Sequence, residues 1–366
     1  MPAPVETDPR AGTRVAPDRL HAWIRHAFER MGVPPDDAEA AAATLLAADV
    51  RGVESHGVAR LPYYHAKIVA GTMDPAAELT VERESAATLV LDSHSGIGLV
   101  HAARAMARTV AKAEAGGLCM TTVRHANHFG IAGAHALAAA RAGLAAIATT
   151  NATPLVVPTY GAEGMLGTNP IAFAVPTGPV GSGAPPLVVD LASSTVAWGK
   201  IEIARRDGKP VPLGWALDEQ GRPTTDPAAA HWLTPLGGDR EHSGQKGYAL
   251  ALMIDTLCGP LAGSSWGRHI GAFRGTEMPS DLGFWFVAWR IDAFRDPNGF
   301  YADVTRMLTE LRESPPAADA PHAVLAPGDP ELEKEREAHE RGIFLTVPVL
   351  ANLAAVGDAV GLAIDF

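Results

Sequence analysis

The first part of the chain shows the spacing of amphipathic helices. In residues 18–32 the apolar positions recur every three or four residues and would share one helical face, which Gly32 ends: Leu20, Trp23, Ile24, Phe28 and Met31. An alanine-rich segment from about Pro34 to Asp49 begins with acidic residues, which suit the positive end of a helix. The pattern predicts two consecutive helices that lead into residues 51–60.

Farther along, short apolar runs alternate with segments of small residues at helical spacing. We predict helices at 99–115 and 131–142, and strands at 88–92, 118–123, 144–150, 171–176 and 187–191. Such alternation is typical of an α/β domain.

The second half of the chain is less regular. Repeated glycine and proline predict an extended loop or hairpin at 207–227, and the apolar residues that follow predict a buried helix at about 246–261. Residues 282–291 look like a strand running back out of the domain. The proline-rich residues 314–331 are predicted to be extended, and the charged run 331–341 to be a solvated helix.

Composition and charge exclude several classes of function. The 366 residues include 30 Lys and Arg against 41 Asp and Glu, a formal net charge of −11, which disfavours nucleic acid and anionic membranes as partners. The apolar runs are too short to span a bilayer, and Met1–Ala16 lacks the apolar core of a signal peptide. Cys119 and Cys258 alone do not make a disulfide framework. These features predict a soluble cytoplasmic protein whose anionic ligands are bound by local positive groups.

The segment R-G-V-E-S-H-G-V-A-R at 51–60 concentrates groups that can bind a small anion. If residues 54–65 form a helix or tight helical turn, Ser55, His56, Arg60 and Tyr64 could line one wall of a pocket, where the arginine fork suits a carboxylate. The alternative is a serine cap at a helix start, a solvated arginine and a histidine satisfied by backbone.

A second concentration, H-A-N-H-F-G-I-A-G at 125–133, lies between a predicted strand and helix, where ligands of α/β sheets usually bind. A histidine there can pass a proton near neutral pH, as hydride transfer at a carbonyl or alcohol requires, or it can simply cap the helix. His125, His128 and His135 also invite a zinc interpretation. No acidic or cysteine ligand accompanies them, so we predict no metal site.

Three further positions suggest a cofactor. In G-M-L-G-T-N-P, Thr168 and Asn169 could bind a phosphate or a nicotinamide amide, or form an ordinary turn. Asp190 ends a strand and could accept from ribose hydroxyls or cap a helix. Lys246 could pair with a phosphate or a carboxylate, or be solvated.

Several common motifs are absent from the sequence. No strand runs into G-x-G-x-x-G, so a dinucleotide site here is not the usual Rossmann site. The α/β-hydrolase, P-loop and redox-disulfide motifs are missing as well.

Taken together and in order, six motifs resemble the malate/L-lactate dehydrogenase family of NAD(P)-dependent oxidoreductases: E-S-H-G-V-A-R, H-F-G-I-A-G, G-T-N-P-I-A-F, V-D-L-A-S-S-T-V-A-W-G-K, G-R-P-T-T-D-P and K-G-Y-A-L. That family also includes ureidoglycolate and sulfolactate dehydrogenases, diketogulonate reductase and a cyclic-imine carboxylate reductase. The likeness runs from the first helix to the segment 327–331.

The resemblance implies an α/β fold in which a non-Rossmann nicotinamide-binding domain with a mixed sheet (86–290) is inserted into a largely helical domain (1–85), to which residues 291–366 return. It also implies a homodimer or a dimer of dimers, with the active site in the cleft beside the subunit contact.

The resemblance also implies roles for individual residues. His128 looks like the catalytic acid/base and Arg60 like the clamp on the substrate carboxylate, with Ser55 and His56 orienting the substrate and nicotinamide and Tyr64 close by. The matching cofactor-binding positions are Asn151, Thr168, Asn169, Asp190, Leu191, Ala192, Lys246, Gly328, Asp329 and Pro330. The expected cofactor is NAD, with NADP possible.

We therefore expect reversible hydride transfer between NAD(P) and C2 of a small 2-hydroxy or 2-oxo acid of the malate, lactate, ureidoglycolate or sulfolactate type. Two alternatives are a reductase of cyclic imine carboxylates and a non-catalytic metabolite-binding homologue. The chain departs from the family at Gln245, at Ala249 and in the loop 236–245, near Lys246.

Overall fold

The computed structural model describes residues 11–271 and 278–366 of the chain. Within these ranges, seven strands form one mixed sheet in the order β2 (Thr80–Glu84), β3 (Thr88–Asp92), β4 (Leu118–Ala126), β11 (Leu282–Arg290), β5 (Leu144–Thr150), β6 (Ile171–Val175) and β7 (Leu187–Leu191). Of these neighbours, β3 and β4 are parallel and every other pair is antiparallel. The predicted α/β class and mixed sheet are confirmed.

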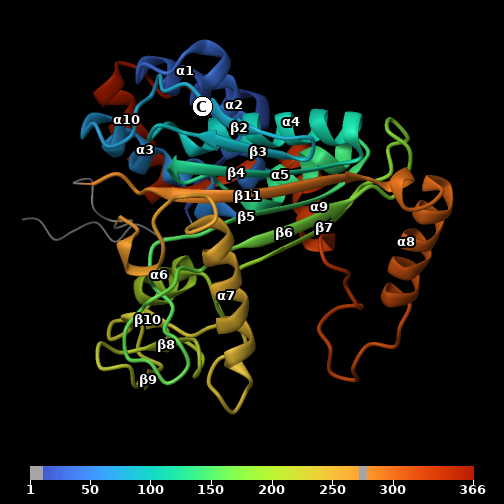
Figure 1. Cartoon of the computed structure of the whole chain (residues 1–366). Coiled ribbons are helices and arrows are strands. Elements are labelled where there is room, and N and C mark those ends of the chain that lie inside the picture. The colour runs from blue at the N-terminus through green and yellow to red at the C-terminus, as the bar shows by residue number, and fades with distance from the viewer. Residues whose placement is uncertain (1–10, 272–277) are drawn as a thin grey trace, which may run out of the picture.

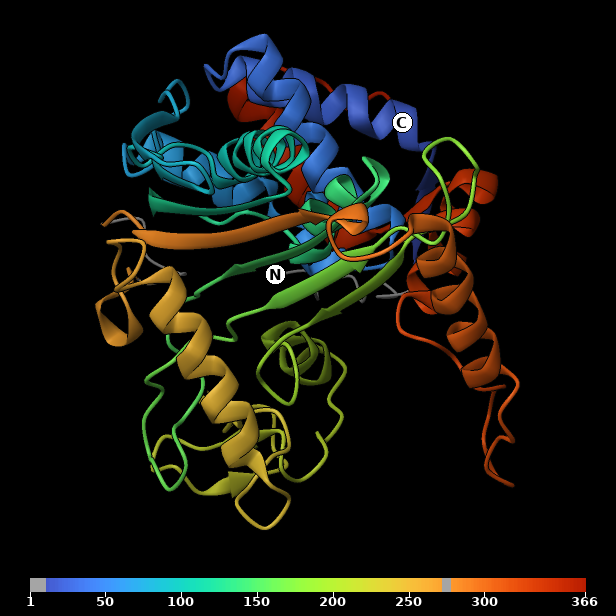
Figure 2. The ribbon, with the colours of Figure 1, turned by 45° about the vertical axis from the view of Figure 1, so that its right-hand side comes forward.

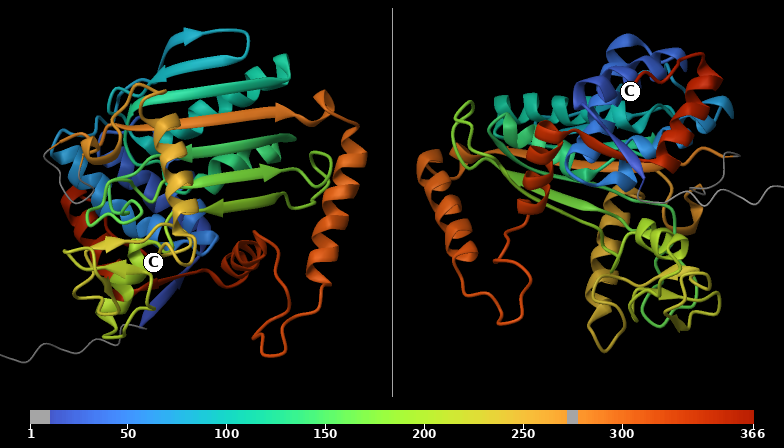
Figure 3. Two further views of the ribbon diagram at one scale, coloured as in Figure 1. Left: turned by 60° about the horizontal axis from the view of Figure 1, so that its bottom comes forward. Right: turned by 180° about the vertical axis from the view of Figure 1, so that it is seen from behind.

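The predicted path of residues 282–291 is wrong. These residues form β11, which does not leave the domain but lies in the middle of the sheet, between β4 and β5 (Figure 3, left). Most of its residues are buried, because this nearly continuous apolar strand is covered on both faces. Its partners are more than 130 residues away in sequence, so local pattern could not place it.

Helices cover the two faces of the sheet. On one face lie α4 (Gly98–Gly116) and α5 (Ala132–Arg141), and α7 (Gly244–Cys258) descends from the other (Figures 1 and 2). The main core lies between the sheet and α4 and α5, where Phe129, Phe284 and Phe286 pack together. The predicted buried helix is only partly buried, since Leu252 and Met253 of α7 are each 48% exposed.

The N-terminal and C-terminal segments build a separate helical layer. It contains α1 (Pro17–Arg30), α2 (Pro35–Val50), α3 (Leu61–Val69) and α10 (Val347–Val360), and β1 (Gly12–Val15) pairs with β12 (Ile343–Thr346). Helix α10 packs on α1 and α3, and α9 (Asp329–Arg341) packs on α2 (Figure 3, right). The C-terminal segment therefore returns to the first helices of the chain.

On the face of the sheet that carries α7, a small lobe has its own apolar cluster. It comprises α6 (Trp198–Arg206) and the strands β8 (Ala216–Leu217), β9 (Pro223–Thr224) and β10 (Trp232–Leu233), packed around Val196, Ile201 and Leu233. Strands β8 and β9 pair antiparallel, which confirms the hairpin predicted within 207–227. Helix α8 (Pro297–Arg312) closes the end of the sheet, and Asp296 caps it by accepting from the Gly299 N–H.

No helix in residues 11–271 and 278–366 is long and apolar enough to cross a membrane. Within the same ranges, no three His, Cys, Asp or Glu side chains are grouped so that they could hold a metal ion.

Candidate active site

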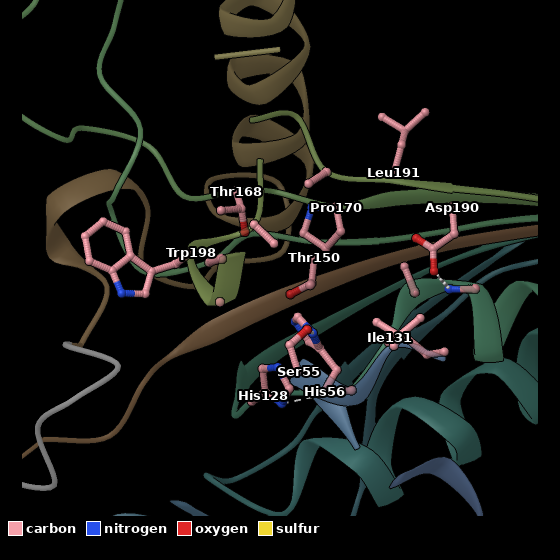
Figure 4. Close-up of a pocket in the computed structure, with 18 of the residues that line it drawn as sticks. Ser55, His56, His128, Ile131, Thr150, Thr168, Pro170, Asp190, Leu191 and Trp198 are labelled. Carbon is pink, nitrogen blue, oxygen red and sulfur yellow. Dashed lines mark hydrogen bonds between the residues drawn. The ribbon is translucent and has the colours of Figure 1, made fainter. Parts of the chain in front are cut away.

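A cavity of about 1290 Å³ opens where the sheet, the N-terminal helices and the α6 lobe meet. Figure 4 shows Ser55, His56 and His128 at one end of it and Asp190 and Leu191 at the other, with Thr150 and Pro170 between them. Its walls come from segments distant in sequence: 51–63, 128–133, 150–155, 188–192, 197–205, 228–232 and 325–331.

One prediction for residues 54–65 was a continuous helix. Residues 54–60 do not form one. They form two 3₁₀ turns, η1 (Glu54–His56) and η2 (Val58–Arg60), separated at Gly57, before α3 begins at Leu61. The buried carboxylate of Asp49 anchors them, because its Oδ2 accepts from the Val58 N–H at 2.7 Å. A Cβ on Gly57 would lie 1.9 Å from Asp49 Oδ1, so this approach requires glycine.

These turns bring three of the predicted side chains to the cavity wall. Ser55, His56 and Arg60 all line it, as does Tyr63. Ser55 Oγ lies 2.9 Å from His56 Nδ1, and Arg60 Nε donates to the Ser55 carbonyl oxygen at 2.6 Å. The Arg60 guanidinium, in η2, is therefore oriented by the backbone of η1.

His128 follows β4 and lies in the same end of the cavity. The His56 ring stacks on it with centroids 5.5 Å apart, and Tyr64 Oη lies 2.7 Å from His128 Nδ1. Tyr64 itself is fully buried and does not line the cavity. Tyr64 was predicted to share the pocket wall. It lies instead behind His128, where its hydroxyl can fix the imidazole tautomer.

The ionisation of this cluster is set by its burial. Burial, and then the Arg60 charge, lower the pKa of His56 to about 4. Burial, followed by His56 and Arg60, lowers the pKa of His128 well below its usual value. Burial raises the pKa of Tyr64 well above 10. At neutral pH His128 is therefore a neutral imidazole beside a protonated phenol, which suits a proton acceptor.

The three histidines considered for zinc do not converge. His125 turns away to pair its Nδ1 with Asp92 Oδ2 at 2.9 Å, and His135 is buried with its Nε2 on the Phe129 carbonyl oxygen at 2.9 Å. Of the three, only His128 lines the cavity.

At the opposite end of the cavity, Asp190 caps a helix across the sheet. Its Oδ2 accepts from the Gly133 N–H at 2.8 Å, which is the dashed line at Asp190 in Figure 4, at the N-terminus of α5. A Cβ on Gly133 would lie 2.6 Å from that oxygen. The side chain is open to the cavity, yet the protein around it raises the pKa of Asp190 to about 6, with burial the largest cause.

The other predicted cofactor positions divide into two groups. Six line the cavity: Asn151, Thr168, Leu191, Ala192, Gly328 and Pro330. Three lie outside its lining. Asn169 is buried behind it and accepts from the Ala152 N–H, Asp329 pairs with Arg312, and Lys246 is exposed on α7.

Sequence reasoning did not single out several wall residues. Arg51 begins the motif at 51–60, but no role was assigned to it from sequence. It lines the cavity and is 5% exposed. Its Nη1 donates to Glu335 Oε2 at 3.0 Å. Glu331 also lines the cavity, although it lies in a charged run that looked wholly solvated. For Trp198, the motif V-A-W-G-K was a signal that could have found it.

Comparison with known proteins identifies the family. A sequence profile described as malate/L-lactate dehydrogenase matches residues 15–354. The chain belongs to the malate/L-lactate dehydrogenase family. This confirms the resemblance seen in the six motifs.

Three relatives each match between 68% and 94% of the chain. It is 39% identical over 305 residues to a malate dehydrogenase of Pyrococcus horikoshii, covering 82% of this chain and 83% of that one. It is 33% identical over 347 residues to a ureidoglycolate dehydrogenase (NAD(+)) of Escherichia coli O157:H7, covering 94% and 96%. It is 40% identical over 248 residues to a (2R)-3-sulfolactate dehydrogenase (NADP(+)) of Chromohalobacter salexigens, covering 68% and 72%.

Among solved structures, malate dehydrogenase from Entamoeba histolytica superposes with a TM-score of 0.91 at 30% identity, covering 97% of this chain and 100% of that one. The agreement extends over the sheet, the helical layer and the lobe, since nearly every residue is covered.

Proposed function

We propose that this enzyme, a dehydrogenase of the 2-hydroxy acid class, transfers a hydride between NAD and C2 of a small 2-hydroxy or 2-oxo acid in the cavity between His128 and Asp190. The observation that carries the proposal is the cluster at one end: a neutral His128, oriented by Tyr64, shares the cavity with Arg60, Ser55 and His56.

The residues present fit a nicotinamide dinucleotide. The cavity exceeds the roughly 300–1,000 Å³ typical of small-molecule sites, which leaves room for a cofactor beside a substrate. Three of the four wall residues from Gly130 to Gly133 are Gly or Ala, and the strip includes the start of α5, where N–H groups other than that of Gly133, which Asp190 accepts, favour phosphate. Asp190 then supplies an acceptor suited to ribose hydroxyls. When bound, the nicotinamide would supply or take the hydride.

Each residue at the reactive end has a defined task. Arg60 presents a fixed guanidinium to the substrate carboxylate, which sets the face of C2 that meets the cofactor. In oxidation, His128 takes the proton of the C2 hydroxyl; in reduction, it returns a proton to the carbonyl oxygen. An anionic substrate beside Arg60 offsets the positive charge that lowers the pKa of His128, so substrate binding favours protonation for reduction.

A panel of acids tests this function. Purified enzyme should reduce at least one of pyruvate, oxaloacetate or 3-sulfopyruvate with NADH, followed by loss of reduced-cofactor absorbance. His128→Ala should lower kcat by about 10²-fold or more, because general acid–base catalysis contributes that much. Arg60→Lys should mainly raise KM, because the two-point grip is lost. Activity confined to a cyclic imino acid would favour the imine reductase alternative, and equal activity of His128→Ala would remove its assigned role.

Further features belong to the same proposal. We propose that the cofactor does not bind in the Rossmann manner. In the described sheet a single pair of neighbouring strands, β3 and β4, is parallel, and no strand is followed by G-x-G-x-x-G.

We propose that the chain divides into domains at 1–85, 86–290 and 291–366. The β1–β12 pairing supports this division, although β2 of the first range joins the sheet.

The assembly and location are proposed on separate grounds. Exposed apolar side chains on and just after α7 support a homodimer. They are Leu252, Met253, Leu261 and Trp266. Cys119 and Cys258 are both buried and unpaired, which fits the reducing cytoplasm. Gel filtration with light scattering would test the dimer.

A further inference from the structure

Two carboxylates line the end of the cavity that lies away from His128. Asp190 ends β7, and Glu331 lies in the first turn of α9. The start of α9 packs on β7, since a Cβ on Gly328 would lie 2.9 Å from the Val188 carbonyl oxygen, and the Glu331 charge contributes to raising the pKa of Asp190. This end is therefore acidic.

The positive charge near these carboxylates is already committed. Of the described residues that line the cavity, three are basic: Arg51, Arg60 and Arg205. Arg60 lies at the reactive end, and Arg205 donates to the Pro227 and Ala230 carbonyl oxygens.

Arg51 also lines the cavity, and its charge contributes to lowering the pKa of Asp190. Its Nη1 pairs with Glu335 Oε2 at 3.0 Å, and Glu335 also accepts from Arg141 Nη2 at 3.2 Å. Arg51 is thus balanced within an existing ion cluster and does not offer an unpaired guanidinium to a further anion.

The geometry of the wall indicates which part of a dinucleotide reaches this end. The hydride-carrying ring must lie beside His128, because the hydride is exchanged at C2 and the proton at the oxygen bonded to C2. From His128 the wall continues through Gly130 to Gly133, whose N–H is bonded to Asp190. A dinucleotide laid along this strip passes its phosphates over Gly130 to Ala132, ahead of the Gly133 N–H that Asp190 occupies, and brings its adenosine ribose beside Asp190 and Glu331.

We propose that Asp190 and Glu331 make the enzyme select NAD over NADP. Asp190 accepts from the hydroxyls of the adenosine ribose, and Glu331 repels a phosphate at its 2′ position. This inference rests on the proposed function, because it takes the cavity to be the dinucleotide site. A 2′-phosphate brings a charge of about −1.5 to −2, and like charges placed together at a binding site oppose binding strongly.

Direct binding measurements on the full chain test the proposal without reference to turnover. Dissociation constants of NADH and NADPH are measured by calorimetry and by the fluorescence of the reduced nicotinamide. The wild type should bind NADH about 100-fold more tightly than NADPH, the size of effect expected when like charges are placed together. Raising the salt concentration should narrow that ratio, because salt screens the repulsion.

Two variants and a matched control assign the effect to residues. Glu331→Gln should tighten NADPH binding by about 10-fold and leave NADH binding within about 2-fold, because it removes one repulsive charge. Asp190→Asn should narrow the ratio of the NADPH and NADH dissociation constants. It should also weaken NADH binding, because an acceptor for the ribose hydroxyls is altered. Glu333→Gln removes the same charge from an exposed position two residues along α9 and should change neither constant.

The outcomes separate this inference from the proposed function. Binding of NADPH as tight as NADH by the wild type, or identical constants for Glu331→Gln and Glu333→Gln, overturns the selection mechanism and leaves the dehydrogenase intact. Failure of the wild type to bind either dinucleotide overturns both. If Glu331→Gln does not fold, two measurements still test the selection mechanism. They are the ratio of NADPH and NADH dissociation constants for Asp190→Asn, and the salt dependence of that ratio for the wild type.

Discussion

At the reactive end, one hydroxyl determines which nitrogen of His128 faces the substrate. Tyr64 Oη lies 2.7 Å from Nδ1, which leaves Nε2, on the opposite side of the imidazole, for the cavity. In the tautomer whose Nδ1 donates to Tyr64, Nε2 carries the lone pair that accepts from a C2 hydroxyl; in the tautomer whose Nδ1 accepts, as it does from the Gly130 N–H at 3.4 Å, Nε2 donates to a carbonyl oxygen. Tyr64 is therefore a positioning residue rather than a substrate contact.

Replacing Tyr64 by phenylalanine tests this role. The change removes the hydroxyl from His128 Nδ1 in a buried site and leaves the longer contact with the Gly130 N–H, and a lost buried partner typically costs about 1–3 kcal/mol, or about 5- to 160-fold in rate. We expect kcat to fall by that factor with KM nearly unchanged, measured under saturating cofactor. Tyr301→Phe is the control, because it removes a hydroxyl from α8, which does not line the cavity. Equal losses in the two variants would remove the special role of Tyr64.

The lowered pKa of His128 predicts the pH dependence of the two directions. Oxidation needs the neutral imidazole. As the pH falls, His128 stays neutral until the pH reaches its pKa, which is below 6.5. We expect kcat/KM for oxidation to stay constant from pH 8 to 6.5 and to decline only under more acidic conditions. Reduction needs the protonated form, so its kcat/KM should rise as pH is lowered. A half-maximal oxidation rate above pH 7 would contradict this assignment.

Sequence grouped the candidate site residues better than it placed their side chains. Ser55, His56, Arg60 and His128 were predicted as one site, and all four line the cavity. Tyr64 was expected on the same wall because α-helical spacing sets residues four apart on one face. The two 3₁₀ turns rotate the chain differently, so Tyr64 points into the core behind His128. No local pattern shows that the buried Asp49 imposes those turns.

At the scale of the element, the turn from α2 to α3 depends on a close contact between Asp49 and Gly57. Gly57→Ala would place a methyl group against the carboxylate, and such overpacking typically costs about 1–3 kcal/mol. We expect urea unfolding to show a loss in that range, and KM for the acid substrate to rise as Ser55 and Arg60 shift.

Gly116→Ala provides the comparison for that variant. Gly116 ends α4, and a Cβ there would meet its nearest atom at an ordinary 3.7 Å. This substitution should leave KM unchanged and stability equal or slightly higher. If Gly57→Ala behaved in the same way, the close contact would not be holding the turn.

Elements marked by local periodicity were predictable, and their arrangement was not. The strand and helix patterns from 88 to 150 correspond to β3, α4, β4, α5 and β5. The lobe helix α6 and the helices α8 and α10 were not predicted. Helix α6 buries Ile201 against residues brought in by distant strands, a context that its own short sequence does not reveal. Strand β11 was recognised as a strand but given the wrong path for the same reason.

At the scale of the whole molecule, one ion cluster joins three parts of the chain. Glu335 of α9 pairs with Arg51 at the end of α2 and with Arg141 at the end of α5. The charged run 331–341 was predicted to be a solvated helix, because a pattern of charges does not reveal that a buried arginine lies opposite one of them. The cluster thus links the C-terminal segment to the N-terminal helices and to the sheet domain.

Neutralising Glu335 should therefore weaken the assembly of the three parts. Glu335→Gln leaves Arg51, which is 5% exposed, without its carboxylate, and breaking a buried pair from one side typically costs about 3–5 kcal/mol. Because Glu335 is itself partly exposed, we expect a smaller loss, about 1–3 kcal/mol, in urea unfolding. Glu333→Gln on the same helix should stay within about 0.5 kcal/mol, as exposed substitutions usually do. Equal unfolding midpoints for the two variants would show that the cluster does not hold the C-terminal segment in place.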